Sequence, residues 1–274
     1  MTESSCGQVN ATGSIVREKD FVEALARGLA ILESFGTERQ RLNATQAAGR
    51  AGLTRAAARR HLLTLAALGY LETDGSSFWL TPKVLRFSGS YLASARLPRL
   101  VQSTMNRLSA QSGAAYSTVV RDQNDVVIIA RSGQLSRSGP MLPHGLHLGA
   151  RLPMFATSTG RMLLAGLPRT LQKAWLDELS RKAGGIPRLT SRTTTDPAEL
   201  ARLIDEARTQ GYCMACEEHE LGVCAVAVPL IDMQGRTHAA LNVVVSATGE
   251  RAKSLCRQYL PLMQAAAQEL RALL

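Results

Sequence analysis

The stretch from Asn43 to Tyr70, NATQAAGRAGLTRAAARRHLLTLAALGY, predicts two helices joined by a tight turn. Asn43 followed three residues later by Gln46 is the pattern of a capping box, which satisfies free N–H groups at a helix start. Gly52 adopts the left-handed conformation without steric cost, as the end of a helix often requires. We therefore expect a helical hairpin in the amino-terminal part of the chain.

The second helix of this hairpin, which we expect Thr54 to cap, has two different sides. Ala58, Leu62, Leu65 and Leu68 recur at helical spacing and predict a buried stripe. The exposed side near the helix start carries candidate DNA contacts: Arg55, Ala56, Arg59 and Arg60. Arginine forks onto guanine edges, and alanine leaves space for a thymine methyl group. The pattern favours a major-groove helix; an ordinary hairpin with a solvated arginine face is the alternative.

The segment LETDGSSFWLTP (71–82) predicts a two-stranded wing behind this helix. Asp74-Gly75 between two short apolar segments is a strong β-hairpin signal. Ser76 is either a phosphate contact or a plain turn residue. Six arginines and no acidic residue lie between positions 39 and 71, so phosphates would meet little repulsion there. Hairpin and wing together predict a winged helix-turn-helix domain.

A further helix is expected over residues 21–35, ahead of the hairpin. Its apolar side is predicted to consist of Phe21, Leu25, Leu29, Leu32 and Phe35. Arg27 lies on the outer side and, together with Asn43, completes the set of predicted DNA contacts.

The composition of the whole chain limits its class. The chain has 274 residues, a formal charge of +10 and a pI near 9.9, which favour a polyanionic partner. No run approaches the roughly 20 apolar residues of a membrane span, and the amino terminus lacks an apolar signal segment. Five unevenly placed cysteines do not make a disulfide framework. We expect a soluble cytoplasmic protein with reduced thiols, without a membrane partner.

The domain organisation follows from changes in pattern along the chain. We predict a mobile segment over 1–19, the winged helix-turn-helix domain over 20–81, a linker helix over 82–97 and a second domain over 98–274. Pro82 suits the first turn of the linker helix. In the second domain, strands are followed by helices and then by strands again. This order predicts an α+β domain with a mainly antiparallel sheet.

Several stretches of the chain resemble the IclR family of bacterial transcription regulators. They are ARGLAILESF (26–35), GLTRAAARRHLLTLAALGYLE (52–72), LTPKVL (80–85), GARLPMFATSTGRMLLA (149–165), RTTTDPAELARLIDEARTQGY (192–212) and EEHELGVCAVAVPL (217–230). The resemblance is strongest to the subgroup that controls aromatic-acid catabolism through the β-ketoadipate pathway. It implies a GAF/PAS-like effector domain, a small organic-acid effector, and dimers or dimers of dimers on palindromic promoter DNA. RNA polymerase is a further partner for members that activate.

The segment Met154 to Arg161 is the first candidate effector site. It runs from a loop into a helix, where the N–H groups of Ser158, Thr159 and Gly160 are expected to be free. Free N–H groups at a helix start attract a carboxylate, and Gly160 lets a ligand approach the backbone. A plain capping turn has the same spacing. The resemblance implies the effector site, because the family's ligand carboxylates lie at this helix start.

The resemblance also implies effector contacts from the later strands. These positions are Ala215, Cys216, Ala225 and Asn242, with Cys224 beside them. The sequence departs from the family here, since many relatives carry aspartate in place of Cys216 and aromatic-acid members often carry arginine in place of Cys224. Without the positive charge of that arginine, a dicarboxylate such as β-ketoadipate is less favoured as the effector. An aromatic monoacid such as para-hydroxybenzoate or protocatechuate is favoured, although both cysteines are equally compatible with a core role.

Metal and enzyme chemistry find little support in the sequence. Cys213, Cys216, His219 and Cys224 have spacings that suit zinc, but on a strand Cys213 and Cys216 face opposite sides. We expect no metal and no cofactor. Glu217, Glu218 and Glu220 lack a base partner, so no catalytic residue is assigned. The alternatives are an IclR-type repressor for another organic acid, a small-molecule-modifying enzyme, and a nucleic-acid-binding protein without a ligand.

Overall fold

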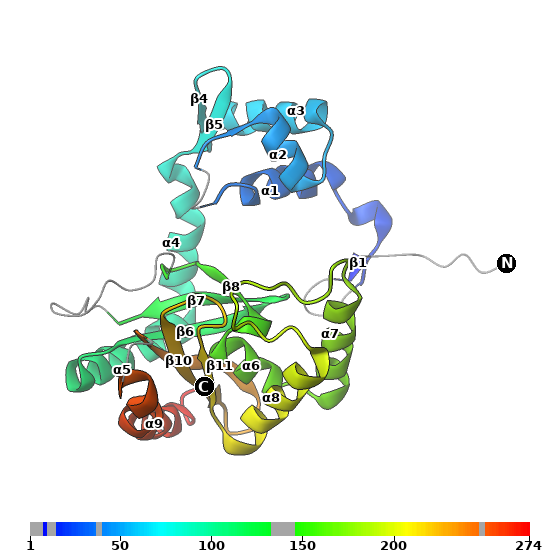
Figure 1. The fold of residues 1–274 in the computed structure, drawn as a ribbon. Coiled ribbons are helices and arrows are strands. Elements are labelled where there is room, and N and C mark those ends of the chain that lie inside the picture. Colours follow the sequence, from blue (N-terminus) through cyan, green and yellow to red (C-terminus); the bar gives the residue numbers. More distant parts are fainter. Residues whose placement is uncertain (1–7, 10–14, 37–39, 133–145, 247–249) are drawn as a thin grey trace. The chain divides into compact units, whose positions relative to one another are not determined.

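The computed structural model describes residues 8–9, 15–36, 40–132, 146–246 and 250–274 (Figure 1). The chain divides into two compact units, Met1–Tyr91 and Leu92–Leu274. The division falls within α4 (Leu85–Ser94), which follows the 3-10 turn η2 (Pro82–Val84) and ends before α5 (Arg96–Ser112). The predicted linker over 82–97 is thus a turn and a helix followed by a break at Ala95. The exact domain limits stay a prediction.

Part of the predicted mobile segment over 1–19 is described. β1 (Gln8–Val9) and β2 (Ile15–Val16) pair in antiparallel fashion, and η1 (Glu18–Asp20) follows. Residues 1–7 and 10–14 lie outside the described residues, and the mobility of the segment stays a prediction.

The first unit contains the predicted winged helix-turn-helix. Its elements are α1 (Glu23–Glu33), β3 (Leu42–Asn43), α2 (Ala44–Ala51), α3 (Arg55–Ala67), β4 (Leu71–Thr73) and β5 (Ser77–Leu80). The capping box is confirmed, because Asn43 Oδ1 accepts from the Gln46 N–H at 3.0 Å and Gln46 Oε1 accepts from the Asn43 N–H at 3.0 Å. Gly52 has a φ of 65°, and Thr54 Oγ1 accepts from the Ala57 N–H. Local sequence signals therefore fix both helix starts and the turn.

On two helices of the first unit, α1 and α3, the buried residues differ in part from those predicted. Ala58, Leu62 and Leu65 are buried as expected, but Leu68 is 54% exposed because α3 has ended there. On α1, Leu25 and Leu29 are 62% and 50% exposed, whereas Ile31 is fully buried. The helix turns Ile31 toward α2 and α3, so only the end of the predicted stripe reaches the core, where Phe35 is buried and Leu32 packs against the cluster.

The second unit is built on one antiparallel sheet of six strands in the order β8-β7-β6-β11-β10-β9. Its strands are β6 (Ala115–Asp122), β7 (Asp125–Arg131), β8 (Arg151–Pro153), β9 (Cys213–Cys216), β10 (Val223–Ile231) and β11 (Thr237–Ser246). Each neighbouring pair is antiparallel. The predicted α+β class with an antiparallel sheet is confirmed.

Helices cover both faces of this sheet (Figure 1). α5 and α9 (Glu250–Leu270) pack on one face through residues such as Met105, Leu108 and Met263. The other face carries η3 (Met154–Ala156), α6 (Ser158–Ala165), α7 (Arg169–Arg181) and α8 (Pro197–Gln210). Successive strand residues therefore point into two separate cores. Within the described part of the chain, no helix is long and apolar enough to cross a membrane.

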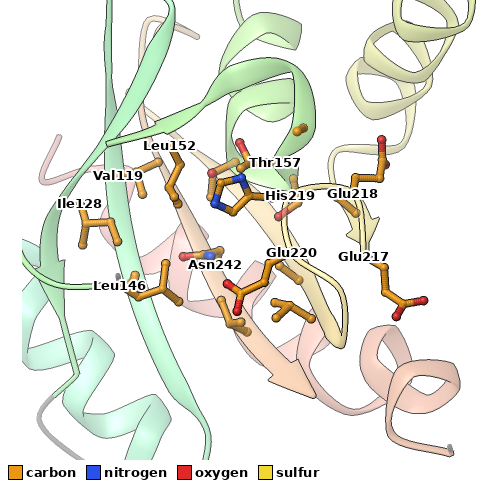
Figure 2. A pocket seen from close by; sticks show the side chains of 18 residues that line it. Val119, Ile128, Leu146, Leu152, Thr157, Glu217, Glu218, His219, Glu220 and Asn242 are labelled. Atoms are coloured by element: carbon orange, nitrogen blue, oxygen red, sulfur yellow. The ribbon is translucent and has the colours of Figure 1, made fainter. Parts of the chain in front are cut away.

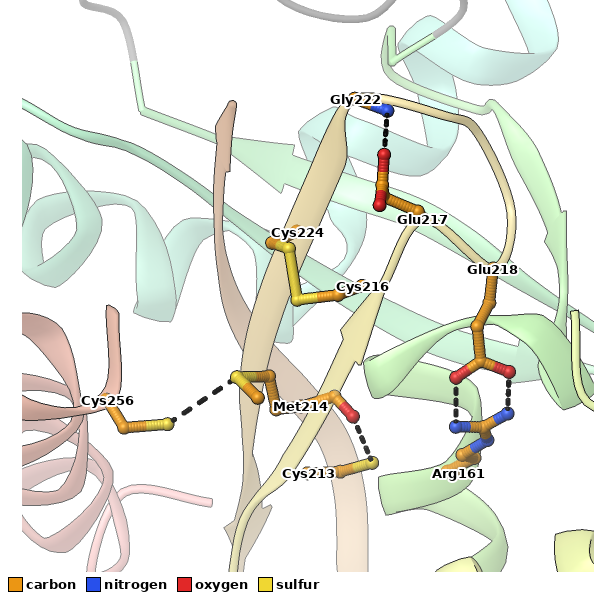
Figure 3. The surroundings of a disulfide bond; sticks show 9 residues. All are labelled: Arg161, Cys213, Met214, Cys216, Glu217, Glu218, Gly222, Cys224 and Cys256. Atoms are coloured by element: carbon orange, nitrogen blue, oxygen red, sulfur yellow. Dashed lines mark hydrogen bonds and ion pairs between the residues drawn. A yellow bond between two sulfur atoms is a disulfide. The ribbon is translucent and has the colours of Figure 1, made fainter. Parts of the chain in front are cut away.

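The expectation of reduced thiols throughout is wrong for one pair. Cys216 on β9 and Cys224 on β10 are direct register partners and form a disulfide (Figure 3). Cys213 and Cys256 are free. The uneven spacing of the cysteines hid this pair because the strands pair only in the folded sheet.

Candidate functional site

A cavity of about 60 Å³ opens between the start of α6, the sheet and the loop that joins β9 to β10 (Figure 2). Its apolar walls are Val119, Ile128, Leu146, Leu152, Val223 and Val244. Its polar lining consists of Ser117, Thr157, Ser158, Thr159, Glu217, Glu218, His219, Glu220 and Asn242, and three alanines, Ala156, Ala215 and Ala225, complete it. Apolar walls with a few converging polar groups are typical of a site for a small organic molecule.

The start of α6 presents backbone donors to this cavity. Thr157 caps the helix, and its Oγ1 accepts from the Gly160 N–H at 3.1 Å. The N–H groups of Ser158 and Thr159 occupy the first two helical positions and have no partner within the helix. The predicted set of three free N–H groups is thus reduced to two, because the cap itself occupies the third.

Three buried polar side-chain atoms without a hydrogen-bond partner gather at the cavity. They are Ser158 Oγ, His219 Nδ1 and Asn242 Oδ1, out of five such atoms in the described part of the chain. In Figure 2, the His219 ring and the Asn242 side chain lie beside the space that Val119 and Leu152 border. A buried polar atom without a partner costs free energy, so such atoms are rare in folded proteins. Their convergence indicates a place where a polar ligand completes the hydrogen bonding.

The charges around the cavity are acidic. Burial lowers the pKa of His219, and the nearby Glu220 carboxylate opposes this shift more weakly, so the ring is neutral at pH 7. Among the described lining residues there are three glutamates and no lysine or arginine. The positive potential available to an anion in this lining therefore comes from the start of α6.

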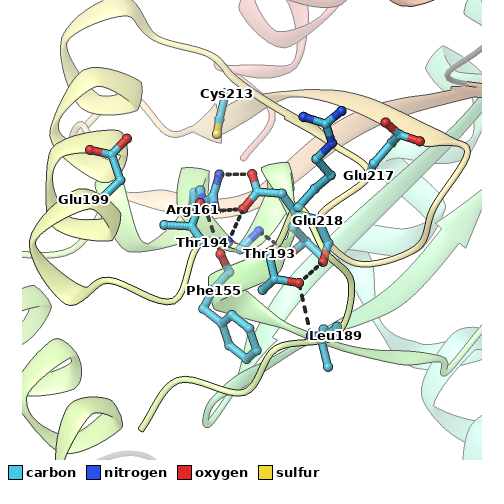
Figure 4. A network of polar contacts seen from close by, with 12 residues as sticks. Phe155, Arg161, Leu189, Thr193, Thr194, Glu199, Cys213, Glu217 and Glu218 are labelled. Atoms are coloured by element: carbon cyan, nitrogen blue, oxygen red, sulfur yellow. Dashed lines mark hydrogen bonds and ion pairs between the residues drawn. The ribbon is translucent and has the colours of Figure 1, made fainter.

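The one arginine close to the start of α6 is already paired (Figure 4). Arg161 is 1% exposed, and its guanidinium donates to both carboxylate oxygens of Glu218 and to the Phe155 carbonyl oxygen. Glu218 also accepts from the Thr194 N–H at 3.1 Å, and Thr193 Oγ1 donates to its carbonyl at 2.7 Å. This network fixes the β9–β10 loop to α6, and Arg161 does not line the cavity.

Two predicted effector contacts, Met154 and Gly160, pack against each other and do not line the cavity. A Cβ atom added at Gly160 would lie 2.3 Å from both Cα and the carbonyl oxygen of Met154. Gly160 is therefore needed so that α6 can approach the η3 backbone closely. The close approach that glycine allows serves packing within the protein.

The sheet brings Ala215, Ala225 and Asn242 to the cavity as predicted, and it places Cys216 and Cys224 elsewhere. The two cysteines belong to the core on the α5 and α9 face. Because side chains alternate along a strand, residues next to Ala215 and Ala225 must point to the opposite face. The same alternation would have found Val223 and Val244, two residues from Ala225 and Asn242. No spacing rule identifies His219 or Ser117, which the loop and a distant strand supply.

The predicted DNA contacts fall into two groups. Arg55, Ala56, Arg59 and Arg60 are exposed on α3, and among the described residues none of the three arginines makes an ion pair. The other four predicted contacts have side chains in local bonds: Arg27 pairs with Glu23, Asn43 and Thr54 cap helices, and Ser76 bonds to Asp74. The start of α3 is therefore the part of this surface with unpaired cationic groups.

Two other arginines of the first unit, Arg41 and Arg50, have partners within the protein. Arg41 pairs with Asp74 and stacks on Trp79, with its guanidinium carbon 4.1 Å from the ring centroid. Arg50 donates to the Ser34 carbonyl at 2.7 Å.

The described residues contain no group of three or more metal-binding side chains placed to hold an ion. Cys213 and Cys216 lie in the cores on opposite faces of the sheet, as the alternation predicts. Burial raises the pKa of the Cys213 thiol to about 12, so it is protonated at neutral pH.

Comparisons with known proteins identify the family of both units. Residues 24–75 match the IclR helix-turn-helix domain, and residues 89–272 match the bacterial transcriptional regulator IclR C-terminal family. Two relatives from Acinetobacter baylyi are each 48% identical. The Pca operon regulatory protein aligns over 95% of this chain and 92% of its own length, and the p-hydroxybenzoate hydroxylase transcriptional activator over 93% of each.

A solved structure extends the comparison to the second unit. It is the inducer-binding domain of the PobR transcription factor from Acinetobacter, a double mutant in complex with 3-hydroxybenzoic acid. It is 42% identical with a TM-score of 0.60, and covers 66% of this chain and all of that domain. From the family matches over both units and from these relatives, the chain belongs to the IclR family of bacterial transcriptional regulators, which are DNA-binding proteins and not enzymes.

Proposed function

We propose that this regulator controls genes of aromatic-acid catabolism and that its effector is a hydroxybenzoate-class acid, para-hydroxybenzoate or protocatechuate. Two relatives at 48% identity are named for the Pca operon and for p-hydroxybenzoate hydroxylase. A related inducer-binding domain holds 3-hydroxybenzoic acid. The cavity at the start of α6 supplies the physical argument for carrying this chemistry to the present chain.

The observation that carries the proposal is the convergence of Ser158 Oγ, His219 Nδ1 and Asn242 Oδ1 on one partly apolar cavity. A benzoate carboxylate fits the N–H groups of Ser158 and Thr159 together with the Ser158 hydroxyl. The ring then lies against the aliphatic walls. A phenolic hydroxyl is both a donor and an acceptor, so it suits the neutral His219 ring and the Glu220 carboxylate.

The same lining argues against β-ketoadipate as the main effector. A dicarboxylate brings two negative charges, and the start of α6 offers one favourable position. A second carboxylate would meet Glu220, and Arg161 is already bonded to Glu218. Burying an unpaired carboxylate is costly, so the monoacid is favoured.

Isothermal titration calorimetry with the full chain tests the effector class. We expect para-hydroxybenzoate and protocatechuate to bind more tightly than benzoate, because benzoate leaves the polar groups at the hydroxyl end unpaired. The missing hydroxyl should cost about 1–3 kcal/mol. β-Ketoadipate should bind most weakly of the four. Tighter binding of β-ketoadipate than of either hydroxybenzoate would refute the assignment.

We further propose that two copies bind a palindromic promoter, as a dimer or as a dimer of dimers, in the cytoplasm. The helix-turn-helix match and the unpaired arginines at the start of α3 support a DNA contact by each copy. Twofold symmetry of the protein is mirrored by palindromic half-sites. RNA polymerase is the further partner if the regulator activates transcription. Analytical ultracentrifugation with and without promoter DNA tests the stoichiometry, and a single copy per promoter would contradict it.

A further inference from the structure

A disulfide closes the base of the loop that forms one wall of the cavity (Figure 3). Cys216 is the last residue of β9, and Cys224 is the second residue of β10, with their Cα atoms 4.1 Å apart. The loop between them contributes five residues of the cavity lining: Glu217, Glu218, His219, Glu220 and Val223. The state of this bond therefore bears directly on the wall of the cavity.

The disulfide lies at the edge of the sheet. β9 is an edge strand, and β10 is its one neighbour, through four register pairs. Beyond these pairs, the Glu217 N–H donates to the Val223 carbonyl at 2.7 Å, and Glu218 pairs with Arg161. The hydroxyls of Thr190 and Thr193 and the Thr194 N–H also donate to Glu217 and Glu218, and the Gly222 N–H donates to the Glu217 carboxylate. His219 and Glu220 lie between these anchored residues.

The four cysteines in the described part of the chain differ in how readily they react. Burial raises the pKa of Cys213 and of Cys256, which disfavours their thiolates. Cys224 is 1% exposed, whereas Cys216 is partly exposed. Cys216 is thus the more exposed residue of the bonded pair, and Cys224 lies directly across from it.

We propose that Cys216 and Cys224 form a reversible redox-modification site whose state sets the affinity of the cavity for its acid. The proposal rests on the proposed function, because a DNA-binding regulator works in a compartment that keeps thiols reduced. Disulfides in that compartment are usually transient or redox-sensing. The oxidant is a low-molecular-weight disulfide such as glutathione disulfide.

The reaction is a two-step thiol–disulfide exchange. The Cys216 thiolate attacks one sulfur of the small disulfide, whose S–S bond breaks and releases one thiolate. The Cys224 thiolate then attacks Cys216 Sγ in the mixed disulfide and releases the second small thiolate. Two protein thiols lose two electrons and two protons, and the small disulfide becomes two thiols. A small dithiol reverses the reaction.

The oxidised form holds the loop in its binding arrangement, so the acid does not have to order it. The reduced form loses this restraint, and part of the binding free energy is then used to order the loop. We expect the affinity for para-hydroxybenzoate to fall on the order of 3- to 10-fold on reduction.

The first test identifies the bond in the full chain after treatment with glutathione disulfide and alkylation of free thiols. Cleavage after glutamate separates Cys216 from Cys224, because three glutamates lie between them. Mass spectrometry should find the two peptides joined in the wild type and in the Cys256→Ala control. They should separate in Cys216→Ala and after dithiothreitol. Peptides that separate in the oxidised wild type would overturn the proposal.

The second test compares para-hydroxybenzoate affinity in the oxidised and reduced full chain by calorimetry. The difference should appear in the wild type and in Cys256→Ala and vanish in Cys216→Ala/Cys224→Ala. Equal affinities in both states of the wild type would overturn the redox effect. Hydrogen exchange of residues 217–223 gives a readout without ligand, and it should be faster in the reduced form. If para-hydroxybenzoate binds neither form, the effector assignment fails, and this exchange difference alone decides the redox site.

Discussion

Ser158 and Ser109 are two buried serines whose hydroxyls lack a hydrogen-bond partner among the described residues. Ser158 lines the cavity, and Ser109 lies on α5 in the core on the other face. We expect Ser158→Ala to weaken para-hydroxybenzoate binding by about 1.5–3 kcal/mol, because the hydroxyl donates to a charged carboxylate. The free energy of unfolding without ligand should stay the same or rise, since an unpaired hydroxyl is removed.

Ser109→Ala is the matched control for this prediction. It should change stability in the same direction and leave the calorimetric affinity unchanged. If Ser158→Ala binds the acid as tightly as the wild type does, the carboxylate does not lie at the start of α6.

His219 makes stability depend on pH in a defined direction. Burial holds its pKa below the ordinary value of 6.5, so the unfolded chain binds more protons than the folded chain in this window. Stability should therefore fall as the pH drops below about 6.5 toward the lowered pKa. His219→Gln should reduce the change in melting temperature between pH 5 and pH 7.5, whereas His147→Gln, at an exposed position, should leave that change as it is. A slope that His219→Gln leaves unchanged would show that His219 is not neutral and buried in the folded protein.

For single residues, the sequence correctly predicted those whose role depends only on residues next to them in the chain. Asn43, Gln46 and Thr54 cap helices as expected, because a cap involves only three or four consecutive residues. Cys216 and Cys224 were wrongly expected to line the same site as Ala215 and Ala225. Side chains alternate along a strand, so each cysteine points to the face opposite that of the neighbouring alanine. His219 could not be found, because its burial depends on how a loop folds over a helix.

Between elements, Arg161 on α6 and Glu218 on the β9–β10 loop form a buried ion pair beside the cavity. Arg161→Met leaves a buried carboxylate without its partner, and we expect the free energy of unfolding in urea to fall by about 3–5 kcal/mol. Arg202→Met is the control, because Arg202 pairs with Glu199 and Glu206 on the exposed side of α8. Its loss should change stability far less, because water screens an exposed ion pair. Equal losses in both variants would mean that burial adds nothing to the Arg161 pair.

The start of α3 is the element that we expect to read DNA. Arg55→Ala and Arg59→Ala should each reduce operator affinity or base selectivity by about 1–3 kcal/mol in gel-shift titrations. Stability should change by less than about 0.5 kcal/mol, because both side chains are exposed and make no ion pair among the described residues. Arg202→Ala, on the second unit, serves as the charge-matched control. If both α3 variants keep the wild-type affinity and selectivity for operator DNA, these arginines do not contact the DNA bases.

The elements themselves were largely predictable, and their packing was less so. The turn signal at Asp74-Gly75 correctly located the wing. The apolar side of the first helix was predicted only in part. Phe35 lies in the core and Leu32 packs against it, but Leu25 and Leu29 are exposed, because hydrophobic spacing alone cannot tell which side meets α2 and α3. Spacing alone could not predict the cavity, because β6, β7, β10, β11 and α6 come together there from distant parts of the chain. The family resemblance supplied five of its lining residues: Ser158, Thr159, Ala215, Ala225 and Asn242.

For the whole molecule, the central claim is that one acid-binding cavity biases DNA binding. A ligand shifts an equilibrium only by the difference in its affinity for the two states. If the acid favours the DNA-binding arrangement, DNA must raise the affinity for the acid by the same factor. If the acid disfavours that arrangement, DNA must lower the affinity for the acid by the same factor.

The most direct test is calorimetric titration of para-hydroxybenzoate into the full chain, first alone and then saturated with operator DNA. We expect the two dissociation constants to differ by about 5- to 150-fold, and the acid to change operator affinity by the same factor. Identical dissociation constants with and without DNA would contradict the claim that the cavity at the start of α6 controls the regulator.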